Sequence, residues 1–260
     1  MAQKIQPGNP RPKITMELLT DMQTMTTRDC ADCATGFTPH DVEFGGRTIF
    51  TQTRCEACQE RACKASEDAE RVRTAEAKKK AREDAFLAIC PPLYRDTDPE
   101  RIHARFREAA FTWTWNPVGV GFVGMAGKGK TRAAYLLMNR MVQAGHRCAA
   151  MTSTTFGKIC VDQFADDKAR KAQAEKDLRA CYTASVWFLD DLGKQRMTER
   201  GEMELYAVLE HRTANMLPTI WTANAKSDVL CKMFSEDRGE PIMRRLIEFS
   251  RITAVWRDGQ

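Results

Sequence analysis

The stretch GMAGKGKT, Gly124–Thr131, decides the fold of this chain. It has the form G-x-x-x-x-G-K-[ST], a loop whose glycines let backbone N–H groups turn inward around phosphate oxygens. In such a loop we expect Lys130 to contact the β- and γ-phosphates and Thr131 to place its hydroxyl on Mg²⁺. The pattern predicts a site for a nucleotide triphosphate. The predicted nucleotide-binding residues are Gly124, Met125, Ala126, Gly127, Lys128, Gly129, Lys130, Thr131 and Arg132.

The residues on either side of this loop support the same interpretation. The apolar run VGVGFVG, Val118–Gly124, is typical of a buried strand, and RAAYLLMNRMVQAG, residues 132–145, has helical periodicity. Four apolar positions of that helix fall on one face: Ala133, Leu137, Met141 and Ala144. Gly145 is a favourable residue just past a helix end. Strand, loop and helix therefore follow in the order that the phosphate-binding motif requires, which a glycine-rich turn alone does not explain.

Length and composition indicate one sizeable core with a small appendage. The chain has 260 residues, of which 43% are hydrophobic, and its net charge is +5 with a pI near 8.7. This mild excess of positive charge permits contact with nucleic acid but does not require it. No apolar run approaches the roughly 18 residues of a membrane span, and the first residues are polar. We therefore expect a cytoplasmic protein that makes no membrane contact.

Four of the ten cysteines form a pattern typical of a metal site. The segments CADC and CEAC together read C-x₂-C-x₂₁-C-x₂-C, just past the usual zinc-ribbon spacing. Four thiolates give a closed tetrahedral site for Zn²⁺, whose expected role is structural. Unpaired or disulfide-bonded cysteines are the alternative, and disulfides are rare in a reducing compartment. The predicted zinc ligands are Cys30, Cys33, Cys55 and Cys58, with Cys63 and His40 as alternatives.

A charged stretch joins the cysteine-rich segment to the nucleotide-binding part. Residues 66–89, SEDAERVRTAEAKKKAREDAFLAI, contain many good helix formers with opposite charges at helical spacing, which predicts an exposed connecting helix. The segment CPPLY, Cys90–Tyr94, should end that helix. The predicted organisation is a flexible N-terminus (1–24), a zinc-binding domain (25–65), a charged helical linker (66–95) and a nucleotide-binding domain (96–260).

Downstream of the loop, strands and helices alternate, which predicts an α/β fold with a mostly parallel sheet flanked by helices. RCAAMT, residues 147–152, predicts a second strand, and residues 155–180 are expected to be helical. SVWFLDDLG, residues 185–193, predicts a buried strand that ends in two carboxylates beside the phosphate loop. There Asp190 would hold Mg²⁺, and Asp191 would polarise the attacking water.

Two later segments add polar residues to this region. PTIWTAN, residues 218–224, predicts a strand ending at Asn224, whose amide can orient the attacking water or the γ-phosphate, or instead cap a helix. RGEPIMRRLIEF, residues 238–249, predicts a helix that carries Arg244 and Arg245 just before the last strand, RITAVW. Adjacent arginines are usually surface charge, but a nucleotide site assembled between subunits needs an arginine from the neighbour.

In this order, GMAGKGKT, WFLDDLGKQRMTE, TAN and RGEPIMRRL resemble the AAA+ ATPases of the DnaC type, the loaders of replicative helicases. The resemblance covers residues 90–256, and the DDLG form is shared with the IstB-type helper ATPases of transposition. Several loaders are similar to this chain in carrying a small zinc-containing domain that contacts the helicase. IstB-type proteins generally lack such cysteine pairs, so the N-terminal segment favours a loader.

The resemblance implies a role for each motif residue. Lys130 and Thr131 correspond to Walker A, Asp190 and Asp191 to Walker B, Asn224 to sensor 1 and Arg245 to the arginine finger, with Arg244 and Arg238 as alternatives. The sequence departs from the family pattern in two ways. Asp191 stands where most AAA+ proteins have Glu, which shortens the side chain by one bond of about 1.5 Å and implies slow turnover. The chain ends a few residues after its last predicted strand, so we expect a minimal helical lid or none.

The resemblance also implies a mechanism. ATP would let the ATPase domains self-associate through their ATP sites and grip single-stranded DNA while the zinc domain holds a DnaB-type helicase, and hydrolysis would reset the complex. Basic residues of the segment 155–181 would either contact DNA phosphates or form a solvated helix face: Lys158, Lys168, Arg170, Lys171, Lys176 and Arg179. The alternatives are an IstB-like helper of transposition, a small-molecule P-loop kinase, and an ATP-sensing DNA-binding adaptor with little turnover.

Overall fold

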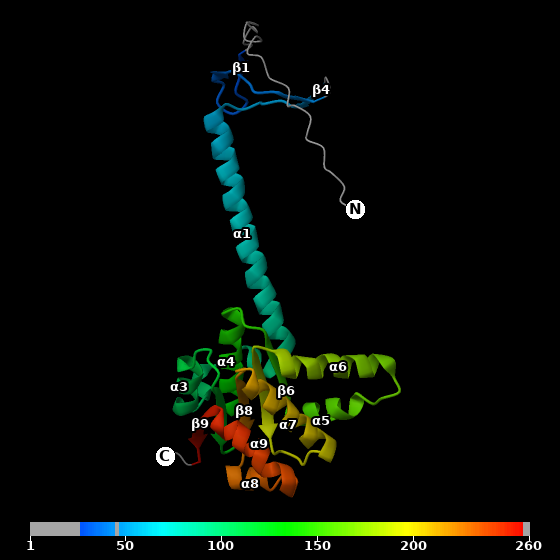
Figure 1. The fold of residues 1–260 in the computed structure, drawn as a ribbon. Helices are drawn as coiled ribbons and strands as arrows, with labels where there is room; N and C mark the ends of the chain where they lie inside the picture. The colour runs from blue at the N-terminus through cyan, green and yellow to red at the C-terminus, as the bar shows by residue number, and fades with distance from the viewer. Residues whose placement is uncertain (1–26, 45–46, 257–260) are drawn as a thin grey trace, which may run out of the picture. The chain divides into compact units, whose positions relative to one another are not determined.

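A computed structural model describes residues 27–44 and 47–256 of the chain. The predicted flexible N-terminus, residues 1–24, lies outside the described residues. The chain divides into two compact units, Met1–Thr74 and Ala75–Gln260 (Figure 1). This division falls inside the predicted linker, and the predicted boundaries at residues 65 and 95 remain predictions. Within the described part of the chain, no helix combines the length and the apolar character needed to cross a membrane.

The first unit contains two short antiparallel hairpins and the start of a long helix. Strand β1 (Arg28–Asp29) pairs with β2 (Gly36–Phe37), and β3 (Val42–Phe44) pairs with β4 (Arg47–Phe50). Helix α1 (Glu56–Ile89) continues into the second unit. It confirms the helix predicted over residues 66–89 but begins earlier. Most of its side chains are exposed, because few apolar residues fall on any one face and charges dominate.

The second unit is built on a parallel sheet of five strands in the order β6-β7-β8-β5-β9. The strands are β5 (Gly119–Gly124), β6 (Cys148–Thr152), β7 (Val186–Leu192), β8 (Thr219–Ala223) and β9 (Ser250–Val255). The structure contains the strand predicted before the phosphate loop and all four strands predicted after the loop. Side chains of β7 alternate between the faces, so that Val186 and Phe188 join one core while Trp187 and Leu189 join the other. The predicted α/β fold is confirmed.

Helices cover both faces of this sheet (Figure 1). One core contains buried side chains from the end of α1, from α3 (Ala104–Thr112) and from α4 (Lys130–Gln143). The other contains side chains from the helices that follow in the chain. These are α5 (Ser153–Asp162), α6 (Lys168–Thr183), α7 (Glu199–Ala214), α8 (Ser227–Cys231) and α9 (Glu236–Glu248). Two short elements, α2 (Pro92–Arg95) and the 3₁₀ turn η1 (Pro99–Arg101), connect α1 to α3.

Two details of the sequence prediction are wrong. The helix expected over residues 155–180 is two helices, because α5 ends at Asp162 and α6 starts only at Lys168. The side chain of Asp167 caps the second helix by accepting hydrogen bonds from two first-turn N–H groups. Ala144 was expected on one face with Ala133, Leu137 and Met141, but unlike them it is exposed, since α4 ends at Gln143; Gly145 follows with a φ of +94° and ends the helix as predicted.

One charged side chain lies entirely in the core. Arg212 is 0% exposed and joins the ends of several elements. Its guanidinium donates to the carbonyls of Cys181 (2.7 Å), Ala184 (3.0 Å) and Pro218 (2.6 Å), and to the hydroxyl of Thr219 (3.1 Å). Burial lowers its pKa to about 10. Because backbone acceptors satisfy the charge, this arginine is a structural element and not an exposed basic residue.

Candidate nucleotide and metal sites

The phosphate loop lies between the end of β5 and the start of α4. Gly124 has a φ of +147°, and a Cβ there would lie 2.0 Å from the carbonyl oxygen of Val255. Gly129 has a φ of +84° and immediately precedes the first helical residue, Lys130. A Cβ at Gly129 would lie 2.9 Å from the carbonyl oxygen of Arg101, and the first-turn N–H groups of α4 that follow it are available to an anion. The glycines of the motif are therefore required by the backbone itself.

Lys130 is held beneath the loop. Its side chain is 7% exposed, and Nζ donates to the carbonyl oxygens of Gly124 and Met125 at 2.8 Å each. Burial lowers the pKa of this lysine, while the nearby Asp191 and Asp190 carboxylates raise it in part. An anion in the loop would likewise favour the charged form. The arrangement thus holds the ammonium group of Lys130 at the loop, next to the expected phosphate position.

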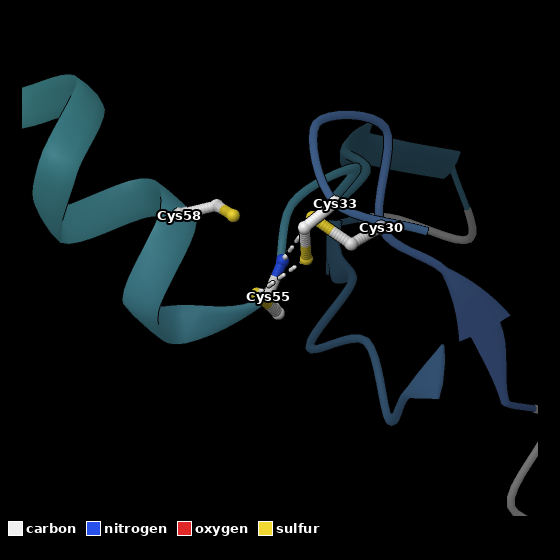
Figure 2. Close-up of side chains that lie close together, drawn as sticks. All are labelled: Cys30, Cys33, Cys55 and Cys58. Atoms are coloured by element: carbon white, nitrogen blue, oxygen red, sulfur yellow. Dashed lines mark hydrogen bonds between the residues drawn. The ribbon is translucent and has the colours of Figure 1, made fainter. Parts of the chain in front are cut away.

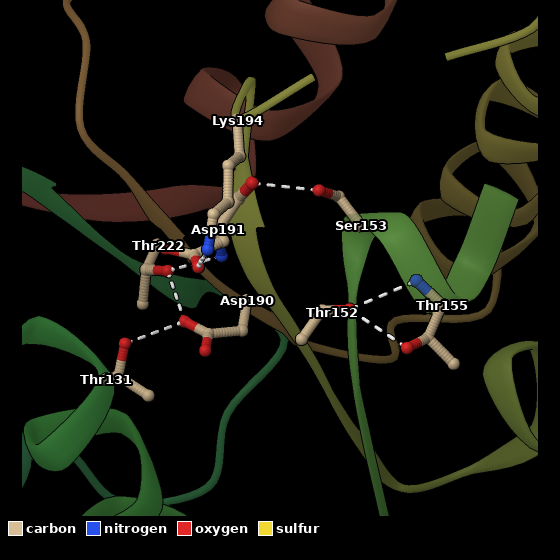
Figure 3. Close-up of polar contacts among 8 residues, drawn as sticks. All are labelled: Thr131, Thr152, Ser153, Thr155, Asp190, Asp191, Lys194 and Thr222. Carbon is tan, nitrogen blue, oxygen red and sulfur yellow. Dashed lines mark hydrogen bonds and ion pairs between the residues drawn. The ribbon is translucent and has the colours of Figure 1, made fainter. Parts of the chain in front are cut away.

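Thr131 and Asp190 meet although they are 59 positions apart in the chain (Figure 3). The Thr131 hydroxyl donates to Oδ1 of Asp190 at 2.9 Å, and the Thr222 hydroxyl donates to the same oxygen at 2.6 Å. Asp190 is 6% exposed, and burial raises its pKa while these two hydrogen bonds lower it in part. A hydroxyl and a buried carboxylate at this separation are oxygen ligands of the type that Mg²⁺ prefers. The predicted magnesium ligands are therefore adjacent.

Asp191 has a strained backbone. Its φ is +56°, in the left-handed region that residues other than glycine rarely adopt. The conformation is held by its N–H, which donates to the Thr222 hydroxyl at 2.8 Å, and by its carbonyl, which accepts from the Ser153 hydroxyl at 2.8 Å. Its carboxylate forms an ion pair with Lys194 at 3.1 Å. Strain of this kind concentrates at functional sites.

A cavity of 450 Å³ opens over the loop, a size suited to a nucleotide. It brings the exposed Asn224 together with Lys130, Thr131 and Asp191. Asn224 does not cap the following helix, since α8 begins after Lys226 with no side-chain cap. The lining residues are Leu93, Tyr94, Arg101, Ala126, Gly127, Gly129, Lys130, Thr131, Arg132, Asp191, Lys194 and Asn224. Gly124, Met125 and Lys128 belong to the loop but do not line the cavity.

Several residues of this site are not identified by any sequence motif. Tyr94 and Arg101 come from the connection between α1 and α3, and Tyr94 stacks on Tyr135 at 5.2 Å with the Arg132 guanidinium 5.6 Å from its ring. Thr222 is 0% exposed in β8. A threonine two positions before Asn224, between Trp221 and Ala223, was the one sequence signal available for it. The segment between α1 and α3, which carries Tyr94 and Arg101, contains no sequence signal of this kind.

The candidate finger arginines lie away from this cavity. Arg245 on α9 pairs with Glu210 on α7, with Nη2 2.6 Å from Oε2, and its side chain is 21% exposed. Arg244 and Arg245 line a second cavity of 320 Å³ together with Tyr206. Arg238 pairs with Glu199 at 3.6 Å. The structure therefore does not bring any of the three arginines to the phosphate loop of the same chain.

The four predicted zinc ligands meet in the first unit (Figure 2). Their Sγ atoms all lie within 4.8 Å of one another, and Sγ of Cys33 is 3.7 Å from Sγ of Cys55. A zinc tetrahedron with Zn–S bonds near 2.3 Å has S–S edges of about 3.8 Å, which this separation matches. Cys55 precedes α1 and Cys58 lies in its first turn, so the helix start positions the second pair.

The surroundings of these sulfurs also suit a metal. The backbone N–H of Cys55 donates to Sγ of Cys30 at 3.2 Å and, as the largest cause, lowers the pKa of that thiol to about 6. Arg61 donates to Sγ of Cys58 at 2.9 Å. Both contacts favour thiolates, the form that binds zinc, although the neighbouring Cys33 thiol and burial together raise the pKa of Cys58. Cys63 and His40 are not members of the four-sulfur cluster; they line a separate cavity.

Comparison with known proteins gives one curated relative. No protein-family model matches the chain. The chain is similar to the replicative helicase loader DnaI of Bacillus subtilis (strain 168), with 27% identity over 150 residues, which is 55% of this chain and 47% of DnaI. The chain therefore spans about half the length of the curated relative it matches.

Solved structures share the fold at low identity. A crystal structure of DnaI matches with a TM-score of 0.51 and 15% identity, covering 65% of this chain and 92% of that one. AMPPCP-bound DnaA from Aquifex aeolicus matches with a TM-score of 0.50 and 16% identity, covering 65% of this chain and 51% of that one. At such identities the likeness establishes the fold alone, which is the AAA+ fold. The resemblance of this chain to the DnaC-type AAA+ proteins is thereby confirmed, through sequence similarity to DnaI and a shared fold.

Proposed function

We propose that this chain uses ATP to load a hexameric replicative helicase onto single-stranded DNA in the cytoplasm. The observation that supports the proposal most is the contact between the Thr131 hydroxyl and the Asp190 carboxylate at the phosphate loop, 2.9 Å across 59 positions of sequence. Such a contact suits Mg²⁺ held beside a nucleotide. The sequence similarity to DnaI then favours a loader among the proteins that use this fold.

In the proposed ATP site each residue has a distinct task. Lys130 and the N–H groups at the start of α4 would bind the phosphates, and Thr131 and Asp190 would hold Mg²⁺. Bound Mg²⁺ would neutralise charge that develops on the phosphates. Asn224 and Asp191 line the cavity where the attacking water would be oriented. Because Asp191 is shorter than the usual Glu, we expect slow hydrolysis.

Helices α5 and α6 carry the features expected of a DNA-binding surface. The six basic residues expected either to contact phosphates or to form a solvated helix face are all exposed, although Arg170 is paired with Asp162. Phe164 in the connection between these helices is 67% exposed, and the Arg200 guanidinium lies 5.0 Å from its ring centre. An exposed aromatic ring beside cations is the combination that single-stranded DNA binding uses, since bases stack on it without sequence preference. We therefore assign the DNA contact to this surface.

The first unit offers a surface for a protein partner. In the hairpin of β3 and β4, Val42 is 49% exposed, Ile49 is 65% exposed and Phe50 is 50% exposed. Apolar side chains gathered on so small a unit are typical of an interaction surface. Zinc would hold this hairpin in place, because a unit of this size has little core of its own. We propose that this surface contacts the helicase.

Cys30→Ser is expected to release the metal and unfold residues 25–65, while the ATPase unit stays folded. Binding and folding are coupled in small zinc domains, and three thiolates leave the tetrahedron open. The variant should contain less than about half the zinc of the wild type after dialysis, and hydrogen exchange should show loss of protection in the first unit alone. Cys63→Ser, outside the four-sulfur cluster, is the matched control and should retain zinc. Wild-type protein purified without zinc would contradict the assignment.

The loader function can be tested with purified components. Immobilised full-length chain should capture a hexameric DnaB-type helicase, and with ATP it should place that helicase on a circular single strand that offers no free end. Cys30→Ser should lose capture but still bind ATP. A chain that binds ATP and DNA but never retains the helicase would support instead the IstB-like helper of transposition.

A second candidate differs from the loader in rate alone. An ATP-sensing, DNA-binding adaptor with little turnover would need the same cavity, and it is favoured by the shorter Asp191 and its ion pair with Lys194. Single-turnover measurement of ATP hydrolysis on DNA separates the two candidates. Hydrolysis no faster than dissociation of the complex from DNA would favour the adaptor.

A further inference from the structure

Lys194 lies in the turn that follows β7 and points back toward the carboxylate of Asp191 (Figure 3). Its Nζ is 3.1 Å from Oδ2 of Asp191, and the lysine side chain is 66% exposed. Both residues line the nucleotide cavity together with Lys130 and Thr131. Lys194 is therefore a further ammonium group beside the phosphate loop, and although it lies within the motif WFLDDLGKQRMTE, no role was predicted for it from the sequence.

The main chain that carries this ion pair is held firmly. The N–H of Asp191 donates to the Thr222 hydroxyl, and its carbonyl accepts from the Ser153 hydroxyl, both at 2.8 Å, and from the Lys194 N–H at 3.2 Å. Gly193 has a φ of +80°, and a Cβ there would lie 2.4 Å from a neighbouring side chain. The turn therefore keeps the base of the Lys194 side chain in a fixed position at the edge of the cavity.

The ion pair itself can exchange partners. The lysine is 66% and the aspartate 27% exposed, and a pair that water reaches on one side contributes little to stability. Lys130 is different, since it is 7% exposed and already donates to two backbone carbonyls. A terminal phosphate carries more negative charge than one carboxylate and presents three acceptor oxygens. A nucleotide triphosphate in the cavity would therefore compete with Asp191 for the ammonium group of Lys194.

We propose that Lys194 distinguishes ATP from ADP by exchanging the Asp191 carboxylate for the γ-phosphate. The inference rests on the proposed ATP site. Without nucleotide, Lys194 neutralises Asp191. With ATP, the ammonium group contacts the terminal phosphate, and the released carboxylate is free to accept a hydrogen bond from the attacking water. ADP has no terminal phosphate and leaves the ion pair in place. The same exchange thus couples recognition of ATP to exposure of the carboxylate that hydrolysis requires.

Equilibrium binding of ATP and ADP to the full chain, measured by calorimetry with Mg²⁺, tests the assignment. Lys194→Gln should weaken ATP binding about tenfold, the loss expected for one charge-assisted hydrogen bond, and change ADP binding less than about twofold. Lys194→Arg keeps the charge and should retain the preference for ATP. Lys226→Gln is the matched control, because Lys226 is an exposed lysine of the same unit that lines a different cavity.

The outcomes separate this inference from the proposed function. If the wild type binds ATP and both Lys194→Gln and Lys194→Ala keep its ATP-to-ADP preference, Lys194 does not contact the γ-phosphate, although the ATP site stands. If the wild type binds neither nucleotide, the proposed function and this inference fail together. Thermal melting verifies that the variants fold, as expected for a side chain that is 66% exposed. Equal weakening of ATP and ADP binding would also overturn the assignment.

Discussion

Lys130→Ala is expected to abolish measurable ATP binding. Lys130 is 7% exposed, and its ammonium group is the one side-chain cation that the loop motif places on the β- and γ-phosphates. Its loss also leaves the Gly124 and Met125 carbonyls, each 2.8 Å from Nζ, without this donor. With charge-assisted hydrogen bonds lost at two phosphate groups, affinity should fall at least about a hundredfold. Calorimetric titration of ATP into the full chain measures the effect.

Two controls accompany this variant: a lysine removed elsewhere in the same unit, and a measurement of folding. Lys226→Ala removes a lysine of the same unit that lies outside the nucleotide cavity, and it should bind ATP as the wild type does. Thermal melting of Lys130→Ala should show that the second unit is folded, because alanine suits the first turn of a helix. Wild-type ATP affinity in folded Lys130→Ala would end the assignment of this loop as the phosphate site.

Arg245→Ala is expected to bind ATP normally but to hydrolyse it very slowly. Arg245 lies outside the nucleotide cavity of its own chain, on α9, which suits a group that acts on the ATP of a neighbouring subunit. Such fingers contribute roughly 10³ to 10⁵ in rate in GTPases, which is an upper guide here. In the isolated chain the guanidinium is held by Glu210 at 2.6 Å, so assembly would have to replace that partner. Steady-state hydrolysis on single-stranded DNA measures the loss.

Glu210→Gln is the matched control for this variant. It removes the charge of the partner while leaving Arg245 in place, and Glu210 is 45% exposed, so the fold should tolerate the change. If Arg245 served only to join α9 to α7, both variants would behave alike. A finger instead predicts loss of hydrolysis in Arg245→Ala and its retention in Glu210→Gln.

Mixing two inactive variants tests whether Arg245 acts between subunits. In a mixture of Arg245→Ala and Asp190→Ala, some interfaces combine an intact magnesium site with an intact arginine, and these should regain activity. Normal hydrolysis by Arg245→Ala, or no recovery in mixtures that co-assemble on single-stranded DNA, would contradict the assignment. Arg244 and Arg238 would then be the next arginines to change.

The strands and the phosphate loop were predictable because their signals are local. Each strand is a short apolar run, and Gly124 and Gly129 have the positive φ values that the loop motif demands. The four-cysteine cluster was predictable for a similar reason, since each pair of cysteines lies within one turn of chain. Two errors arose where local signals compete. Helix-forming residues continue between α5 and α6, yet Asp167 starts a new helix there, and Ala144 follows the apolar spacing of α4 beyond the point where the helix ends.

The sequence by itself determined the phosphate loop, the α/β class and the four-cysteine cluster, because those depend on residues that are neighbours in the chain or on the parallel order of strands. Only the tertiary structure decided which distant side chains share a site. The spatial order β6-β7-β8-β5-β9 differs from the chain order, and it places Thr222 against Asp190. Packing likewise buried Arg212 against backbone carbonyls and paired Arg245 with Glu210. Such pairings follow from the distances between elements after folding, for which a linear sequence carries no local signal.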